Sequence, residues 1–469
     1  MRPLEILIVT LLAAYLAWPF SRRPRPVWVT SLPALALIVT LVHFGVEGYR
    51  WQMIPLYGLT PLLALAGLIG LNQPRAGSFP SSALGSALTL ILLAVSTALP
   101  ILLPVPHLPK MSGPYQVGTQ IFYMEDASRK ELYSGEDGLR RFMIQVWYPA
   151  DPRPTDKQGP WMNHAEIYAP SISDYLRLPH FFLDHLTLVK SPAYVDAPLH
   201  PAPTGGYPLI SFSHGWNGFA AQNTGQMVEL ASHGYVVVSI EHTYGARITV
   251  FPDGTVALNN PNALPEGKPE AEYDAAARQL VDQWAGDISY TLDFLASQNA
   301  NTGGPFSGAL DLNRIGVYGH STGGGAAIQF CGTDPRCKAV LGLDPFMTPV
   351  SLAVLDNGLD QPAFFMFSQA WADDVDSKNA RLFRGFIAHA PNSQGVISID
   401  GTRHYDFSDL PLLSPIAPQL GLKGPLDGKQ VVKIVDTYLL AFFNSTLQGQ
   451  PSDLFHGDFG AFKEVHPMK

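Results

Sequence analysis

The sequence predicts an α/β protein with a mostly parallel sheet and helices on both faces, preceded by a helical region in a membrane. Two observations support this prediction. From Gly113 onward, short apolar runs typical of buried strands alternate with longer stretches of helical periodicity, and that order builds parallel sheets through helical crossovers. Before that point, residues 1–106 contain only eight charged residues and are otherwise almost entirely apolar or small.

The N-terminal region holds four apolar stretches, which are 4–18, 27–46, 53–71 and 83–103. A helix needs about 20 residues to cross the hydrocarbon core of a bilayer. The last three stretches have that length. The first is shorter and would also suit the apolar part of a signal peptide, but no small-residue cleavage site follows it and three further stretches do. We therefore predict a four-helix transmembrane anchor at 1–106, with buried core helices as the alternative.

Basic residues in the short loops predict the orientation of this anchor. They are Arg2 at the N-terminus, Arg22, Arg23 and Arg25 in the first loop, Arg50 in the second and Arg75 in the third. The first and third loops therefore face the cytoplasm, and both termini and the domain at 107–469 lie outside. Apart from His43, near the end of its stretch, no ionisable residue lies deep in a span, so we interpret the helices as an anchor rather than a transporter.

The soluble domain at 107–469 shows the strand and helix alternation. The runs that predict strands are 141–148, 208–213, 235–240, 315–318, 339–343, 363–367 and 395–399. The stretches that predict helices are 222–233, 272–297, 323–330, 378–388 and 431–443. The segment 152–203, rich in proline, aromatic residues and histidine, does not follow this alternation. It predicts either a lid or pocket wall, or a surface excursion with a small core of its own.

A glycine-rich turn around Ser321 is the most informative motif. Gly319-His320-Ser321-Thr322-Gly323 matches G-x-S-x-G and lies between a predicted strand and a predicted helix, the context of a nucleophile elbow. In that sharp turn, side chains two positions before and after the serine would collide, and glycine removes the collision. The helix that follows would place its N-terminus beside developing negative charge. We predict that Ser321 is a nucleophile; a tight packing turn is the alternative.

A serine nucleophile needs a base and an orienting acid, and in hydrolases of this topology the chain order is serine, acid, histidine. The histidines after Ser321 are His389, His404, His456 and His466. His404 follows the predicted strand that ends at 399, so its loop can reach the turn, and we choose it as the base. Asp344 ends a buried apolar run, where a carboxylate needs a partner, and we choose it as the acid. Its rivals, which lie in polar loops, are Asp356, Asp360, Asp373, Asp374 and Asp376.

The oxyanion formed on attack requires amide donors that are already in place. The amide of Thr322, directly after the nucleophile, is the first candidate. The run PLISFSHGWNG supplies the second, because Gly215 lets the backbone approach the turn and presents the amide of Trp216. An ordinary strand-to-helix turn is the alternative for this segment.

Seven segments together resemble a known family. They are GPYQVG at 113–118, VWYPA at 146–150, SFSHGWNG at 211–218, SIEHTYGAR at 239–247, YGHSTGGG at 318–325, GLDPFMTP at 342–349 and GTRHYDFSD at 401–409. Their order is similar to that of the platelet-activating factor acetylhydrolases of the secreted and intracellular type-II group, over about residues 112–450. The resemblance implies an α/β-hydrolase fold, no metal and hydrolysis of short or oxidised acyl esters.

Residue by residue, the resemblance places the nucleophile on Ser321, the acid on Asp344 and the base on His404. It places the oxyanion amides on Trp216 and Thr322. The family usually has a large aromatic residue where this chain has Thr322, and often leucine where it has Trp216; both positions lie beside the acyl pocket and bear on substrate preference. The four-span anchor does not occur in the well-known members.

The remaining polar and sulfur-containing residues give weaker indications. The net charge of −9 argues against a nucleic-acid partner. Cys331 and Cys337 would form a disulfide outside the cytoplasm or stay as two buried thiols, and no cysteine and histidine spacing indicates zinc. Glu241 and His242 end a predicted strand and suit a structural role better than a catalytic one. Trp371 either lines the pocket or covers core, and the histidines of 152–203 are expected at the surface or in a small core; they include His164, His180 and His185.

These observations predict a membrane-tethered serine esterase without a cofactor, acting on a small-molecule or lipid ester at the outer face. A broad carboxylesterase or polyester hydrolase is the alternative within enzymes, and acyl transfer to another acceptor would use the same residues. A membrane-anchored binding module without activity is the alternative from another class, although every triad position is filled by a competent residue. The oligomeric state is open.

Overall fold

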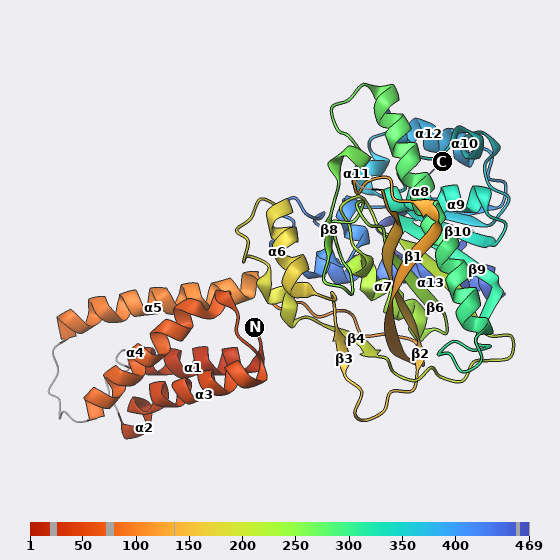
Figure 1. Cartoon of the computed structure of the whole chain (residues 1–469). Helices are drawn as coiled ribbons and strands as arrows, with labels where there is room; N and C mark the ends of the chain where they lie inside the picture. The colour runs from red at the N-terminus through yellow and green to blue at the C-terminus, as the bar shows by residue number, and fades with distance from the viewer. Residues whose placement is uncertain (19–25, 72–78, 136, 456–459, 469) are drawn as a thin grey trace. The chain divides into compact units, whose positions relative to one another are not determined.

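The computed structural model describes residues 1–18, 26–71, 79–135, 137–455 and 460–468 (Figure 1). The chain divides into two compact units. The first consists of Met1–His107 with two later segments, Ser173–Val189 and Leu413–Ile416. The second contains the rest of the chain from Leu108 onward. The first unit therefore includes segments from far along the chain as well as the N-terminal residues.

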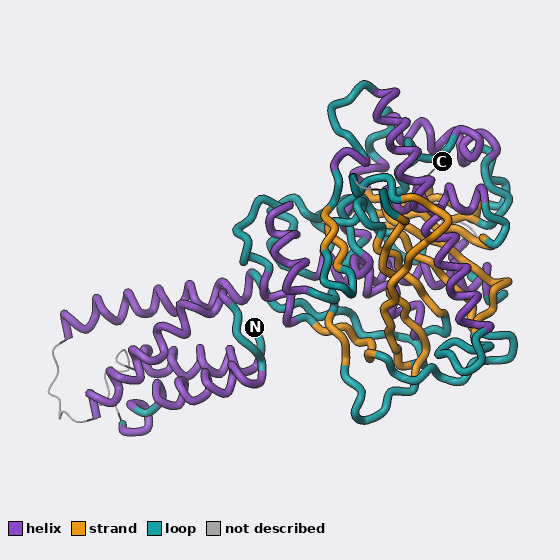
Figure 2. The backbone as a smooth tube through the Cα atoms, in the orientation of Figure 1, coloured by secondary structure: helices purple, strands orange, loops and turns teal. Residues whose placement is uncertain are grey.

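The second unit is built on one sheet of 11 strands, in the order β13-β12-β11-β10-β9-β5-β6-β2-β1-β4-β3 (Figure 2). The strands are β1 (Gln116–Lys130), β2 (Leu139–Ala150), β3 (Gln158–Pro160), β4 (Lys190–Val195), β5 (Tyr207–Ser213), β6 (Val236–Glu241), β9 (Leu310–His320), β10 (Cys337–Leu343), β11 (Ala363–Ser368), β12 (Ser393–Ile399) and β13 (Val465–Pro467). Strands β6, β5, β9, β10, β11 and β12 run parallel. Strands β1, β2 and β13 pair in antiparallel fashion nearer the edges, and β7 (Ile248–Val250) and β8 (Val256–Leu258) form a separate hairpin.

Helices cover both faces of this sheet, as the sequence predicts. They are α6 (Ala165–Tyr175), α7 (Thr224–Ser232), α8 (Glu270–Ala300), α9 (Thr322–Thr333), α10 (Leu352–Asn357), α11 (Gln369–Ala372), α12 (Lys378–Ile387) and α13 (Gly428–Leu447). Helices α8, α9 and α12 pack into one core cluster and α7 and α13 into another. Neighbouring strand residues alternate between the two clusters, as Val317 and Tyr318 do. Both faces are buried, which explains why the strands read as continuous apolar runs.

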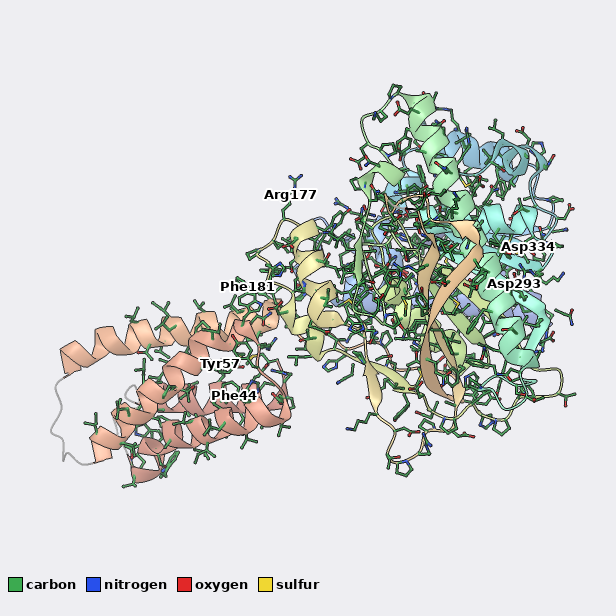
Figure 3. The ribbon with its side chains drawn as sticks, in the orientation of Figure 1. Phe44, Tyr57, Arg177, Phe181, Asp293 and Asp334 are labelled. Atoms are coloured by element: carbon green, nitrogen blue, oxygen red, sulfur yellow. A yellow bond between two sulfur atoms is a disulfide. The ribbon has the colours of Figure 1, made fainter. Side chains whose placement is uncertain are left out.

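The segment 152–203 is part of the sheet rather than a separate excursion. It contains β3, α6 and β4, and β4 pairs with both β1 and β3. The stretch Ser173–Val189 belongs instead to the first unit. There the Trp51 indole donates a hydrogen bond to the carbonyl of Phe182, and its ring lies 5.3 Å from that of Phe181. Phe181 is labelled in Figure 3.

The first unit is a bundle of apolar helices. They are α1 (Pro3–Ala17), α2 (Val27–Thr30), α3 (Leu32–Val46), α4 (Ile54–Leu71), which follows the short 3-10 turn Trp51–Met53, and α5 (Phe79–Leu102). Among the described residues, two helical segments are long and apolar enough to cross a membrane, Val27–Val46 and Trp51–Ile69. Pro3–Ala17 and Ala87–Leu102 are apolar but shorter. The four stretches expected from the sequence are all helical, and two of them meet the length of a span.

Charged side chains gather where one end of this bundle brings several helix termini together. The Arg50 guanidinium forms an ion pair with buried Glu5 and donates to the carbonyl of Leu103. Arg2 also pairs with Glu5, and the Glu47 carboxylate accepts a hydrogen bond from the amide of Leu4. The start of α1, the end of α3, the start of α4 and the end of α5 therefore lie at the same end, so the helices alternate in direction.

The two cysteines form a disulfide, which the sequence left open. Cys331 near the end of α9 is bonded to Cys337 at the start of β10, six positions later. The bridge closes the turn that connects the helix after the serine to the next strand. A disulfide of this kind is typical of oxidising compartments.

Replacing both cysteines by serine should lower the free energy of unfolding of the second unit by about 2 kcal/mol, because a short closed loop restrains the unfolded chain only modestly. Urea denaturation followed by near-UV circular dichroism on the detergent-solubilised chain measures this loss. Reduction of the wild-type protein should produce the same shift, which provides the control. Two thiols that alkylate without reductant in the native protein would contradict the bridge.

Candidate active site

Ser321 occupies a sharp turn between β9 and α9. Its backbone has φ 56° and ψ −121°, a conformation that L-residues rarely adopt. A Cβ at Gly319 would lie 2.2 Å from the carbonyl oxygen of Gly323, and a Cβ at Gly323 would lie 2.1 Å from that of Ser213. Both positions therefore require glycine because the neighbouring backbone approaches too closely for a Cβ. The G-x-S-x-G pattern predicts this same requirement at the two glycines. The Ser321 amide donates to Leu343 at the end of β10 and holds the turn against the sheet.

Asp344 lies directly after β10 and is fully buried. Its Oδ1 accepts a hydrogen bond from the amide of Ser368 at 2.8 Å, and its Oδ2 accepts one from the hydroxyl of the same residue at 2.6 Å. Oδ2 also lies 3.0 Å from Nδ1 of His404. Three donors directed at one carboxylate suit its ionised form, and they fix His404 with its proton on Nδ1 and its Nε2 free to accept another.

His404 begins a short 3-10 turn after β12 and lies between two rings. Trp371 stacks on one side, with ring centroids 4.5 Å apart and an interplanar angle of 2°. The His320 ring lies 4.4 Å away, and its Nε2 donates to the carbonyl of His404 at 2.9 Å. Because His320 directly precedes Ser321, this bond ties the loop that carries His404 to the turn that carries the serine.

Electrostatics favour a neutral imidazole at this position. Burial lowers the pKa of His404 below its usual value, so the ring can accept a proton near neutral pH. Burial raises the pKa of Asp344, and the two hydrogen bonds from Ser368 oppose that rise. Burial and the neighbouring His404 lower the pKa of His320 to about 3, which matches its role as a neutral ring that donates from Nε2 and accepts at Nδ1 from the Gln222 amide.

Sequence reasoning missed the residues that support the loop of His404. Asn223 and Gln226, at the start of α7, both donate to the carbonyl of Phe407, at 2.7 and 2.9 Å. The buried carboxylate of Asp409 accepts from the Trp161 indole and from the amide of Gly225. In the sequence, only the presence of polar side chains in an otherwise apolar stretch indicates such contacts. That pattern does not identify the residues with which they pair.

Trp216 and Thr322 both border the same cavity as Ser321. Thr322 is the first residue of α9, so its amide is one of those that a helix leaves unbonded at its N-terminus. Trp216 lies in the loop after β5, where Gly215 approaches so closely that a Cβ there would lie 3.1 Å from the Cβ of Ser321. Ser321, Trp216 and Thr322 thus border one cavity, while Asp344 contacts His404, whose loop is bonded to the residue before Ser321.

The cavity beside Ser321 has a volume of about 600 Å³ and a mostly apolar wall. Its apolar lining residues are Trp216, Leu264, Phe346, Phe367, Trp371, Ala372, Val375, Ala380, Phe383, Ile387, Val396 and Met468. Helix α12 supplies one wall of it. Trp371 both lines the cavity and stacks on His404, so the structure settles the two roles left open for this residue in favour of the pocket.

Four further histidines discussed above, His164, His180, His185 and His242, lie away from Ser321 and His404, and His456 is outside the described residues. His242 is fully buried and contacts Ser213 and Asp287, in line with a structural role. His185 is buried in the first unit, and His164 and His180 are partly or largely exposed. Among the described residues, the one group placed to share a metal ion is Glu5, His43 and Glu47 in the helical bundle, and the carboxylate of Glu5 is already held by two arginines.

Comparison with known proteins identifies relatives over most of the chain. Residues 103–458 match the family model described as platelet-activating factor acetylhydrolase, isoform II. A platelet-activating factor acetylhydrolase of Cavia porcellus is 29% identical over 72% of this chain and 78% of its own length. A probable 1-alkyl-2-acetylglycerophosphocholine esterase of Arthroderma benhamiae is 23% identical over 80% of this chain and 98% of its own.

A solved structure shows the same fold. A ferulic acid esterase from Streptomyces cinnamoneus superposes with a TM-score of 0.63 at 24% identity, over 78% of this chain and 100% of the esterase. The family match covers most of the chain, and the curated relatives are named as acetylhydrolases and esterases. The chain therefore belongs to the platelet-activating factor acetylhydrolase, isoform II, family and is a carboxylic-ester hydrolase.

Proposed function

We propose that the chain is a membrane-tethered serine esterase that cleaves short-chain or oxidised acyl esters of lipids through an acyl-enzyme. Ser321 Oγ attacks the ester carbonyl while Nε2 of His404 takes its proton. The tetrahedral oxyanion is stabilised by the amides of Trp216 and Thr322. His404 then gives the proton to the leaving alcohol, and the acyl group remains on Ser321.

Deacylation reverses these roles. Water attacks the acyl carbonyl, His404 accepts a proton from it, and Ser321 Oγ leaves with that proton. Asp344 keeps the imidazole in the required tautomer and stabilises the imidazolium in both halves. The observation that carries the proposal is the 3.0 Å contact between Asp344 Oδ2 and His404 Nδ1, in a loop that His320 ties to the Ser321 turn.

Burst kinetics test this mechanism. With p-nitrophenyl acetate, an acyl-enzyme that forms faster than it hydrolyses releases nitrophenol rapidly, in an amount equal to the enzyme. A stoichiometric burst, together with recovery of an acetylated Ser321 peptide after acid quench, supports the proposal. A lag-free linear release with no acylated serine in the quenched sample counts against it.

The cavity supports an apolar acyl group as the bound part of the substrate. His404 must protonate the leaving alcohol, so the alcohol lies on its side of Ser321. Trp216 and Thr322, the proposed oxyanion residues, line the cavity, and Trp371 lies between the cavity and His404. This position suits the acyl chain of the ester. The cavity volume of about 600 Å³ exceeds the need of an acetyl group, and this observation favours a broader carboxylesterase as the second candidate.

Narrowing the cavity with Ala380→Phe should lower kcat/KM for p-nitrophenyl octanoate about 10-fold or more relative to the acetate ester, because the added ring takes up space that a long chain needs. Ala388→Phe, on the exposed end of the same helix, is the matched control and should leave the octanoate-to-acetate ratio at the wild-type value. An equal ratio in all three proteins would place the acyl chain elsewhere. A steep preference of the wild type for short acyl phospholipids over other esters would favour the lipid-ester candidate.

Features of the first unit and the disulfide support the proposed tether and its orientation. The apolar helices support membrane insertion, the arginine distribution supports cytoplasmic first and third loops, and the Cys331–Cys337 bridge supports an oxidising compartment for the catalytic domain. Resistance of the protein to carbonate extraction, combined with protease digestion of a C-terminal tag in intact cells, tests both points. A tag protected until the cells are lysed would reverse the orientation.

A further inference from the structure

The peptide between Gly215 and Trp216 is held from the side opposite to the Trp216 amide. The carbonyl of Gly215 accepts one hydrogen bond from Nδ1 of His214 at 2.7 Å and another from the amide of Gly218 at 2.9 Å. In a trans peptide the carbonyl and the following N–H point in opposite directions in one plane. Whatever fixes the Gly215 carbonyl therefore also directs the N–H of Trp216.

His214 makes this contact as a neutral ring in one tautomer. It is fully buried, and burial lowers its pKa far below the usual value. Its Nδ1 carries the proton that Gly215 accepts, so Nε2 must act as an acceptor. That atom lies 3.2 Å from the main-chain amide of His242, which donates to it.

His242 is itself fixed on three sides. Its Nδ1 donates to Asp287 at 2.9 Å, its Nε2 accepts from the Ser213 hydroxyl at 2.8 Å, and its ring stacks on Trp284 with centroids 4.3 Å apart. Ser213, His242 and Asp287 repeat the atom order of a catalytic triad, but all three are fully buried. They have no access to a substrate and act on the adjoining backbone instead.

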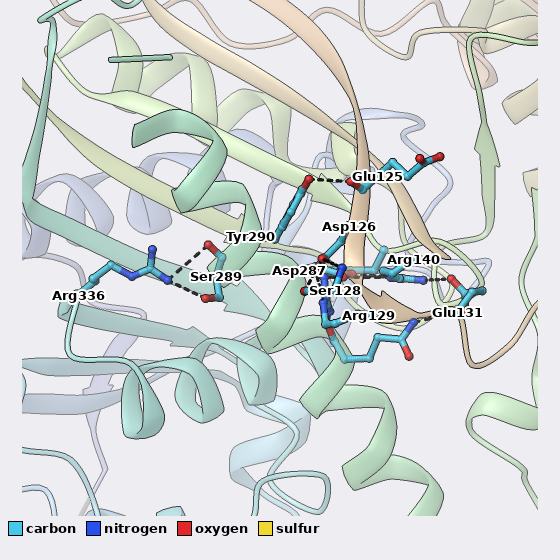
Figure 4. A network of polar contacts seen from close by, with 12 residues as sticks. Glu125, Asp126, Ser128, Arg129, Glu131, Arg140, Asp287, Ser289, Tyr290 and Arg336 are labelled. Atoms are coloured by element: carbon cyan, nitrogen blue, oxygen red, sulfur yellow. Dashed lines mark hydrogen bonds and ion pairs between the residues drawn. The ribbon is translucent and has the colours of Figure 1, made fainter. Parts of the chain in front are cut away.

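Two arginines hold Asp287 (Figure 4). Arg140 donates to its two oxygens at 3.0 and 2.6 Å, and Arg129 donates to Oδ1 at 2.9 Å. Arg140 also donates to the carbonyl of Thr243, the residue after His242. The Arg140 guanidinium and the hydrogen bond from His242 hold the pKa of Asp287 well below its usual range, against the effect of burial. A charged anchor on α8 and β2 therefore sets the position of the segment that supports His214.

We propose that His214 is a positioning residue of the oxyanion hole, which directs the Trp216 amide by holding the Gly215 carbonyl, and that the Asp287–His242 pair fixes its tautomer. This inference rests on the proposed serine-esterase function. An oxyanion donor stabilises the transition state only when it is aimed at the developing charge, and loss of one donor lowers kcat by about 10²–10³. A peptide free to rotate should lose part of that effect, with little change in KM because the ground-state ester needs no oxyanion contact.

Two isosteric substitutions separate this role from simple packing. The side-chain NH2 of asparagine can stand where Nδ1 stands, so His214→Asn keeps a donor for Gly215 and loses the acceptor for His242. In His214→Gln the amide reaches the position of Nε2, so it keeps the acceptor and loses the donor. Each variant retains one of the two contacts of His214, so we expect the two variants to have similar melting temperatures. They can therefore be compared directly with each other.

We expect His214→Gln to lower kcat for p-nitrophenyl acetate about 10- to 100-fold, with KM within about threefold, and His214→Asn to stay within about fivefold of the wild type. Inhibition by a trifluoromethyl ketone, whose adduct with serine places an oxyanion in the hole, should weaken in the same order. Equal losses in both variants, or losses that follow melting temperature alone, would overturn the proposal.

If either variant fails to fold, neutron diffraction on the wild-type protein can show which nitrogen of His214 carries the proton. A deuteron on Nδ1 of His214 directed at the Gly215 carbonyl supports the proposal, and a deuteron on Nε2 refutes it. A wild-type protein without ester hydrolysis would refute the proposed function, while the tautomer would still decide whether His214 holds this carbonyl.

Discussion

Replacing Ser321 by alanine should lower kcat for ester hydrolysis by roughly 10⁶, because the proposed mechanism loses the hydroxyl that forms the acyl-enzyme. The turn tolerates the change, since the Cβ remains and the backbone bonds of residue 321 to Leu343, Gly325 and Phe346 are kept. The variant should therefore keep the circular dichroism spectrum and melting temperature of the wild type. Steady-state hydrolysis of p-nitrophenyl acetate measures the loss.

Ser307→Ala provides the matched control, because Ser307 is an exposed serine on a loop of the same unit. Its activity should equal that of the wild type. Residual activity of Ser321→Ala within about tenfold of the wild type would mean that another nucleophile performs the reaction. Ser213, which also pairs with a histidine, is fully buried and should remain unacylated in the quenched sample.

Asp344→Asn should lower kcat by about 10⁴ while the protein stays folded. The carboxylate accepts from His404 Nδ1 and from two donors of Ser368. An amide can present its NH2 to the imidazole, and it then stabilises the tautomer that carries the proton on Nε2, which cannot act as a base. Comparison of kcat and KM for one ester in the variant and the wild type shows the effect, which should fall almost entirely on kcat.

Asp360→Asn is the control for this change, because Asp360 is an exposed carboxylate that the sequence offers as a rival. A large loss in Asp360→Asn with normal turnover in Asp344→Asn would reverse the assignment of the acid. The pH profile of the wild type gives an independent check. Only the neutral imidazole accepts a proton, so kcat/KM should fall as the pH drops through the pKa of His404, which burial lowers below 6.5.

At pH 6 an exposed histidine would be about three-quarters protonated. The half-buried His404, whose pKa is lowered, should remain mostly neutral there, and kcat/KM at pH 6 should stay within about twofold of its value at pH 7.5. A half-maximal value above pH 7 would show that the charged form of His404 dominates near neutrality. Measurements with one ester in buffers of equal ionic strength make this comparison.

Local sequence patterns were sufficient to predict the central strands and the turn, and to select Asp344 and His404 as the proposed partners of the serine. Gly319 and Gly323 are required by contacts within a few residues or with the adjacent strand end, so their spacing reveals the turn. Asp344 and His404 follow strands whose carboxyl ends meet at one edge of a parallel sheet, and chain order was therefore enough to select them. The buried apolar runs likewise mark the central strands on both faces of the sheet.

Contacts between side chains far apart in the chain could not be predicted in this way. Arg140 and Asp287 lie 147 positions apart, and nothing in either local pattern names the other. The stacking of Trp371 on His404 and the bond from His320 to the His404 carbonyl depend on how two loops cross above the sheet. The inclusion of Ser173–Val189 in the helical unit depends on aromatic packing by Trp51, which periodicity does not encode.

The central claim is that Ser321 is a nucleophile activated by His404. Labelling of the folded full-length chain with a fluorophosphonate probe, followed by peptide mapping, tests this claim most directly. The account predicts one label per chain, on Ser321, lost after heat denaturation and strongly slowed in Asp344→Asn. A folded wild-type chain that takes up no label, or takes it up on another residue, would contradict it.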